Sequence, residues 1–157
     1  MIQVALFKGK SWISRAIQWQ TRSEYSHAAF YLGNGLLLEA WHRGGVRCVT
    51  PYEGHEKGVV IELYDVEGLN EARSSIALKF AMAQVGKAYD FTSVLRFISR
   101  RQERRTDSGK WFCSELVFAA LQKGGVNVLE RIQPWAVSPG MLACSPLLLP
   151  VGTMKIV

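Results

Sequence analysis

The stretch HAAFYLGNGLLLEAW, residues 27–41, constrains the fold more than any other part of this chain. Two apolar runs flank Gly33-Asn34-Gly35, and a short glycine-rich turn between such runs is typical of an antiparallel hairpin. Each run carries one ionisable side chain, His27 in the first and Glu39 in the second. The stretch therefore predicts two paired strands and places these two polar side chains on them.

Further segments predict both strands and helices. Residues 45–54 and 58–66 have the composition of strands, and the tail of the chain ends in another strand-like run. Residues 11–21, 71–85 and 111–121 contain apolar side chains at helical spacing. Because helices and strands are mixed without regular alternation, the pattern favours an α+β fold over a doubly wound sheet.

The first two of these helices have identifiable ends. Ser11 and Asn70 are good N-cap residues, and Gly86 is expected to stop the second helix. The side chains expected to make the apolar contacts of these helices are Trp12, Ala16, Ile17, Trp19, Ile76, Ala77, Phe80 and Ala81.

Length and composition fit one ordinary globular unit. With 157 residues, 48% of them hydrophobic, the chain can bury a substantial core, so we expect a single domain over residues 1–157. Its beginning lacks the apolar stretch and cleavage site of a signal peptide. The most apolar run, residues 141–151, is short and broken by prolines, so we expect no membrane span. These features predict a cytoplasmic protein, or one that is phage-borne or released on lysis.

The cysteines and the charges exclude several classes of function. Cys48, Cys113 and Cys144 are odd in number and far apart, which indicates free thiols. No cysteine or histidine shows the paired spacing of a zinc site, so we expect no metal. The net charge of +6 is concentrated in Arg100 to Arg105. Such runs are usually solvated, and without a nucleic-acid motif around it we expect no nucleic-acid partner.

Cys113 lies in the first turn of the helix predicted within WFCSELVFAAL. A helix N-terminus stabilises a thiolate, so this position suits a nucleophile. A buried cysteine is more often a small core residue, and that alternative remains open. A nucleophile needs a base, for which His27, His42 and His55 are available. His27, at the start of the hairpin's first strand, is the best placed.

The hairpin register decides whether Glu39 can orient His27. With a three-residue loop, Leu32 faces Leu36 and Ala29 faces Glu39, which puts Glu39 diagonal to His27 on one face. A two-residue Asn34-Gly35 turn shifts the pairing by one and moves Glu39 to the other face. A Cys-His-Glu arrangement therefore requires the first register, which in this interpretation means the three-residue loop.

YSHAAFYLGNG, GKAYDF and WFCSELV together resemble the circularly permuted branch of the NlpC-type, papain-like cysteine hydrolases, the YiiX-like proteins. The late VSPGML is similar to that family's serine/threonine-proline segment. The resemblance implies a papain-like core in which an antiparallel sheet packs against the helix that carries the cysteine. It also implies Cys113 as nucleophile, His27 as base and Glu39 as the polar third residue. Tyr89, in the segment similar to the family's Gly-x-Pro-Tyr, becomes a candidate oxyanion donor or wall of the site, with a plain core aromatic as the other interpretation.

The resemblance implies acyl transfer without a metal or an organic cofactor. The leading prediction is a thiol amidase or peptidase that hydrolyses a short peptide, such as a cell-wall muropeptide, through a thioester. Glu115 is expected to stabilise the helix N-terminus instead of taking part in chemistry. Two alternatives remain: a lipid or ester acyltransferase or thioesterase on the same residues, and a non-catalytic binding or assembly module, such as a phage-tail component. The run Arg100 to Arg105 is a candidate for favouring anionic substrates.

Overall fold

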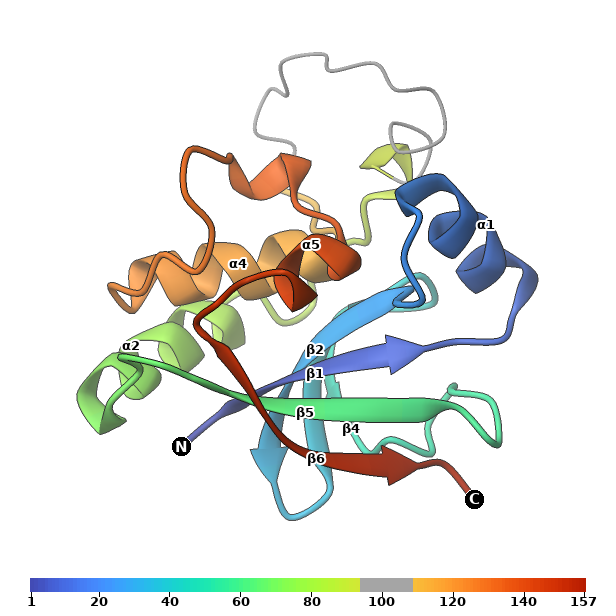
Figure 1. Ribbon diagram of the computed structural model, residues 1–157, viewed down its shortest axis with the longest axis horizontal. Helices are drawn as coiled ribbons and strands as arrows, with labels where there is room; N and C mark the ends of the chain where they lie inside the picture. Colours follow the sequence, from blue (N-terminus) through green and yellow to red (C-terminus); the bar gives the residue numbers. More distant parts are fainter. Residues whose placement is uncertain (94–108) are drawn as a thin grey trace.

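The computed structural model describes residues 1–93 and 109–157, so the run Arg100 to Arg105 lies outside the described residues. Its central element is a six-stranded antiparallel sheet in the order β4-β3-β2-β1-β5-β6 (Figure 1). The strands are β1 (Gln3–Lys8), β2 (His27–Gly33), β3 (Leu36–Trp41), β4 (Gly45–Val49), β5 (Val60–Val66) and β6 (Leu148–Lys155). The predicted α+β class is confirmed.

Helices cover one face of this sheet. They are α1 (Trp12–Thr21), α2 (Glu71–Met82), α4 (Cys113–Lys123), α5 (Pro139–Ala143) and a short 3-10 helix (Pro134–Ala136). Figure 1 shows α2, α4 and α5 together on one side, with α1 apart at the end of the sheet where β1 leads into it. No helix in the described part of the chain is long and apolar enough to cross a membrane.

The main hydrophobic core lies between α4 and the sheet. Residues 116–118, 120 and 121 of α4 are fully buried, and they pack with Phe30 of β2 and Leu38 of β3. A smaller cluster, which includes Phe7, Ala29 and Leu37, covers the opposite face. The sheet is therefore buried on both faces in its middle, and α4 is held rigidly against one of them.

The central strand β1 was not predicted from the sequence. Its middle residues, Val4 to Phe7, are all buried, because β1 lies between β2 and β5 and is covered on both faces. The sequence of such a strand is a short continuous run of apolar residues without alternation. The period-two signal that identifies half-buried strands is absent here for that physical reason.

The predicted caps of α1 and α2 are confirmed, because Ser11 and Asn70 accept hydrogen bonds from the N–H groups of Ser14 and Arg73. Helix α2 ends at Met82, before the predicted stop at Gly86.

Three of the predicted apolar contacts are wrong. Trp12 and Trp19 of α1 are 79% and 78% exposed, and Ile76 of α2 is 53% exposed. Each helix touches the body of the protein along a narrow strip, which in α1 buries Ile17 alone. Side chains outside that strip remain in solvent although their spacing is helical.

The hairpin has the predicted register but not the predicted loop. Tyr31 faces Leu37 and Phe30 faces Leu38, which continues to Ala29 opposite Glu39. The turn itself contains two residues, because Gly33 pairs with Leu36. Asn34 and Gly35 have φ values of 50° and 72°, as a type I′ turn requires. A bulge between Tyr31 and Gly33 then inserts one extra residue and restores the register.

Candidate active site

Glu39 is the centre of a buried hydrogen-bond cluster. The Nε2 atoms of His27 and His55 lie 2.7 Å and 3.0 Å from its Oε2 atom. Arg47 donates from Nε and Nη2 to Oε1, at 3.0 Å and 2.8 Å. The side chain of Glu39 is fully buried, with 0% exposure. A buried carboxylate is tolerated because its lone pairs are taken by charged or polar donors.

Neighbouring strands bring these groups together. His27 begins β2, Glu39 lies in β3, and Arg47 faces Glu39 directly in β4. His55 comes from the loop between β4 and β5. The hairpin register predicted from the sequence thus does bring His27 and Glu39 into contact, and β4 and the following loop add two further donors.

Opposing effects set the protonation states of the cluster. Burial alone raises the pKa of Glu39, but the hydrogen bonds from His27 and His55 outweigh it and hold that pKa far below its usual range. Burial lowers the pKa of His27, against the opposing effect of Glu39. An ionised carboxylate can only accept, so the Nε2 of a neutral His27 carries the hydrogen and Nδ1 the free lone pair. At neutral pH His27 can therefore take up a proton at Nδ1.

Aromatic rings fix the two imidazoles. The ring centre of Phe7 lies 4.9 Å from that of His27 and 4.7 Å from that of His55. The ring of Trp41 lies 5.1 Å from His27 and 4.3 Å from His55. Both imidazoles thus contact two large aromatic side chains. Because the rings are already ordered, they lose little side-chain entropy when a substrate binds.

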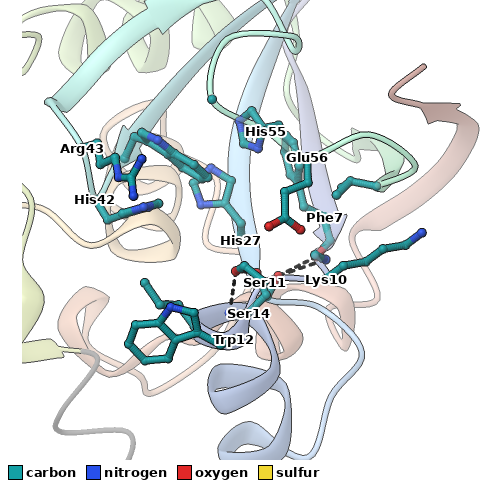
Figure 2. Close-up of a pocket in the computed structure, with 16 residues that line it drawn as sticks. Phe7, Lys10, Ser11, Trp12, Ser14, His27, His42, Arg43, His55 and Glu56 are labelled. Carbon is teal, nitrogen blue, oxygen red and sulfur yellow. Dashed lines mark hydrogen bonds between the residues drawn. The ribbon is translucent and has the colours of Figure 1, made fainter.

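A cavity of about 360 Å³ opens beside this cluster (Figure 2). His27 and His55 reach its wall, and His42 lines it as well. Figure 2 shows Trp12 of α1 on the side of the cavity opposite Arg43. The imidazoles are therefore accessible from solvent although Glu39 is not.

Cys113 is the first residue of α4, and Phe112 is its N-cap. Glu115 accepts a hydrogen bond from the N–H of Phe112 at 3.2 Å, which confirms its predicted role at the helix N-terminus. The backbone N–H of Ala28, the residue after His27, lies near the Cys113 sulfur and acts to lower the pKa of its thiol. Backbone pairing between β2 and β3 runs from Phe30 to Gly33, and Ala28 precedes it, opposite Leu6 of β1.

At Cys113, burial acts against the stabilisation that a helix N-terminus gives to a thiolate. Cys113 is only 1% exposed, and burial raises the pKa of its thiol to about 12. The N–H groups of Ala28 and Ser114 act in the opposite direction without outweighing burial. At neutral pH the thiol is therefore neutral. The free-energy cost of removing water from a thiolate is larger here than the stabilisation that the helix N-terminus provides.

Tyr89 lies close to Cys113. It is 9% exposed, and its ring packs against Phe112 and Phe91. Burial raises the pKa of Tyr89 well above its usual value, and the charge of Cys113 adds to this effect. The segment before it is fixed at β4, where the N–H of Val46 donates to the carbonyl of Lys87. This placement fits both a wall of the site and a core aromatic.

Sequence reasoning missed Arg47 and did not select His55. Arg47 had a signal, because it lies opposite Glu39 once β3 and β4 are paired, and opposite charges stabilise cross-strand neighbours. His55 had none, since a loop brings it back over the sheet from sixteen residues away. With His55, the cluster also becomes a possible metal-binding group: the donor atoms of His27, Glu39 and His55 lie within 4.8 Å of one another.

Comparisons with known proteins agree with this architecture. The profile of a family described as "Permuted papain-like amidase enzyme, YaeF/YiiX, C92 family" matches residues 5–133. The crystal structure of the metalloprotein YiiX from Escherichia coli O157:H7 superposes with a TM-score of 0.71 at 21% identity, covering 98% of this chain and 96% of that one. At this identity the likeness concerns the fold. Comparison with curated protein sequences gives no match.

Proposed function

Because this chain belongs to the permuted papain-like amidase family C92, we propose that it is a thiol-dependent amidase or peptidase that acts through Cys113, His27 and Glu39. One observation carries the proposal. The Cys113 thiol contacts the N–H of Ala28, and the adjacent His27 is held at 2.7 Å by a buried carboxylate. A nucleophile at a helix N-terminus, an imidazole and a group that orients it are the parts of a catalytic triad.

The reaction begins from a neutral thiol and a neutral imidazole. As Sγ attacks the carbonyl carbon of the substrate, His27 Nδ1 takes the thiol proton, and Glu39 stabilises the resulting imidazolium. The backbone N–H of Cys113 and the hydroxyl of Tyr89 are the candidate donors to the oxyanion. The C–N bond then breaks, the leaving amine takes the proton from Nδ1, and the acyl group remains on Cys113 as a thioester.

Water completes the cycle. It transfers a proton to His27 Nδ1 as its oxygen attacks the thioester, and the departing sulfur regains that proton. The products are a carboxylic acid and a free thiol. Because neutral Cys113 needs the imidazole in every turnover, loss of His27 should be nearly as harmful as loss of Cys113.

The cavity supports a peptide substrate with carboxylate groups. Lys10 and Arg43 line it, with Glu56 as the acidic residue of the lining. Cell-wall muropeptides are short peptides of this kind, and we propose them as the substrate class. No step of this mechanism requires a metal or an organic cofactor.

The test is hydrolysis of a muropeptide mixture, followed by mass spectrometry of the products and of the intact protein. The wild type should release new amine and carboxylate ends, and Cys113→Ala and His27→Gln should lose at least about 10³-fold in rate. Cys144→Ser is the matched control, because Cys144 is an exposed free thiol. A product that forms equally with Cys113→Ala would refute the proposal.

The same assay separates the two rival functions. Acyl transfer from phospholipid or thioester substrates, dependent on Cys113 and without amide hydrolysis, identifies an acyltransferase or thioesterase. A folded protein that turns over neither class and gives no adduct on Cys113 is a binding or assembly module.

A second candidate function, binding of a divalent metal, is favoured by the convergence of His27, Glu39 and His55. Two imidazoles and one carboxylate are a frequent protein ligand set for zinc, so His27, Glu39 and His55 would hold the ion. Zinc would act there as a Lewis acid toward a bound carbonyl or water. YiiX, with a similar fold, is described as a metalloprotein.

Metal binding and thiol catalysis compete in this chain. A metal at Nε2 of His27 would replace the N–H that bonds Glu39, so Glu39 could no longer stabilise the imidazolium that forms when Nδ1 takes up a proton. Calorimetric titration of Cys113→Ala with Zn²⁺ tests the metal site without interference from the thiol. Binding that disappears in His55→Phe supports it, and equal binding in both variants contradicts it.

A further inference from the structure

The outer side of α1 carries an unusual combination of exposed side chains. Trp12 and Trp19, seven residues apart and thus on one side of the helix, are 79% and 78% exposed. Arg15 is also exposed and lies on the same side, and the exposed Arg22 follows directly as the C-cap of the helix. Single exposed apolar residues are common, but two almost free indoles interleaved with arginines are not. We call these four residues the tryptophan-arginine stripe.

The stripe is not used to pack α1 on the protein. The opposite side of the helix does this, with Ile17 buried at 4% exposure. Gln18 adds hydrogen bonds to the carbonyls of Gly9 at 3.0 Å and Glu24 at 2.7 Å. Ser11 caps the first turn. The helix is therefore fixed in orientation, and its stripe faces solvent at the end of the sheet away from α2 (Figure 1).

The cations of the stripe are not neutralised by their neighbours. Helix α1 contains no acidic residue. None of the ion pairs among the described residues involves Arg15 or Arg22 of the stripe, or Lys10, which precedes α1. The nearby ion pair between Lys8 and Glu24 leaves these side chains out. The surface thus presents uncompensated positive charge next to exposed indole rings.

We propose that the tryptophan-arginine stripe docks this protein on a lipid bilayer that contains anionic lipids. Tryptophan is enriched at membrane interfaces, where its ring lies at the level of the headgroups. Arginine pairs with phosphate through its planar guanidinium, and its long stem allows the charge to stay among the headgroups.

The size of the stripe argues against a protein partner. Each tryptophan can bury roughly 150–250 Å², so two of them supply far less than the roughly 800 Å² that each side of a stable protein interface buries. A bilayer has no such requirement, because a few inserted rings together with phosphate contacts give reversible binding.

Docking would also set the direction from which substrate reaches the site. Trp12 belongs both to the stripe and to the lining of the cavity that holds His27 (Figure 2). A bilayer contacting the stripe would therefore lie at the mouth of that cavity. This consequence rests on the proposed function and favours amide substrates that are attached to a membrane. The docking itself does not depend on catalysis.

Vesicle sedimentation tests the docking, with Cys113→Ala as the parent protein so that turnover plays no part. Vesicles of phosphatidylcholine mixed with phosphatidylglycerol should bind it, and vesicles of phosphatidylcholine alone should bind it at least about tenfold more weakly. Trp12→Ala/Trp19→Ala and Arg15→Gln/Arg22→Gln should each lose about tenfold in partition coefficient.

Matched controls separate the stripe from general surface properties. Tyr52→Ala removes an aromatic ring that is 64% exposed and lies outside α1. Lys79→Gln/Lys123→Gln makes the same change in net charge on α2 and α4. Both controls should bind as the parent does, with all variants checked by circular dichroism. Equal losses in stripe and control variants overturn the proposal. So does tighter stripe-dependent binding to duplex DNA than to anionic vesicles, which would make the partner a nucleic acid.

Discussion

Two carboxylates on the same sheet, Glu39 in β3 and Glu62 in β5, each accept hydrogen bonds from a cluster of donors, yet they suit different tasks. Glu39 is bound by two histidines and an arginine. Glu62 is bound by Lys8 at 2.6 Å and by the hydroxyls of two tyrosines. Glu39 is fully buried, whereas the side chain of Glu62 is 23% exposed.

The difference lies in which partners can exchange a proton. Burial raises the pKa of Tyr25 to about 12, and the hydrogen bond to Glu62 raises that of Lys8. Neither group titrates near neutral pH. His27 differs from both, because burial lowers its pKa and leaves it a neutral base at neutral pH. Three donor side chains surround each carboxylate. Around Glu62 they form a structural cluster, and around Glu39 they form a cluster suited to acid and base chemistry.

The largest effect should come from comparing Glu39→Gln with Glu62→Gln. Glu39→Gln removes the counter-charge of Arg47, whose side chain is 21% exposed, and weakens the hydrogen bonds to a fully buried side chain, which should cost about 1.5–3 kcal/mol of unfolding free energy. It should also lower amide hydrolysis by about 10³- to 10⁴-fold, since the tautomer of His27 is lost. Glu62→Gln should cost at most about 1 kcal/mol and leave the rate unchanged. Urea unfolding measures the loss of stability, and the muropeptide assay measures the loss of rate. Equal losses in the two variants would contradict the proposed difference between the Glu39 and Glu62 clusters.

A smaller effect is expected for His55→Phe, which keeps the ring contact with Phe7 but removes one donor to Glu39. Loss of one such hydrogen bond, about 1.4 kcal/mol, corresponds to about a tenfold lower kcat. His55→Gln, which retains a donor, should recover part of the rate. His55 acts as a positioning residue in this interpretation, and a changed KM with an unaltered kcat would argue against it.

The stability should fall with decreasing pH on account of the Glu39 cluster. The native pKa of His27 lies below its ordinary 6.5, so the unfolded chain binds that proton first and stability decreases below about pH 6.5. Glu39, with its lowered native pKa, adds a second decrease below about pH 4.5. One proton contributes at most about 1.4 kcal/mol per pH unit. In His27→Gln the first decrease should become shallower, with His42 retaining the remainder; an unchanged slope would show that His27 is not responsible.

The smallest effect is expected in the Glu62 cluster itself. Tyr25→Phe removes one of the hydrogen bonds to Glu62, while Tyr64 and Lys8 keep their contacts with this carboxylate. The expected loss is about 0.5–1.5 kcal/mol in unfolding free energy, with no change in the pH profile of activity. A shifted activity profile would mean that the two clusters are coupled through β1.

Local signals in the sequence were reliable where chemistry is local. The caps at Ser11 and Asn70, the helix that begins at Cys113 and the strands of the hairpin depend on nearby residues, and the structure contains all of them. The exposed indoles of α1 show the limit of such signals, because helical spacing indicates a helix but not which strip of it will be covered.

By itself, the sequence determined the α+β class, the hairpin that carries His27 and Glu39, and the position of Cys113 at a helix N-terminus, and it left two registers open for that hairpin. Only the tertiary structure decided the rest. It made β1 the centre of the sheet, brought His55 over Glu39, and buried Cys113 so that its thiol is neutral. The physical reason is that burial and long-range contacts arise from packing between distant segments, and they set both the pKa values and the partners that a local pattern leaves open.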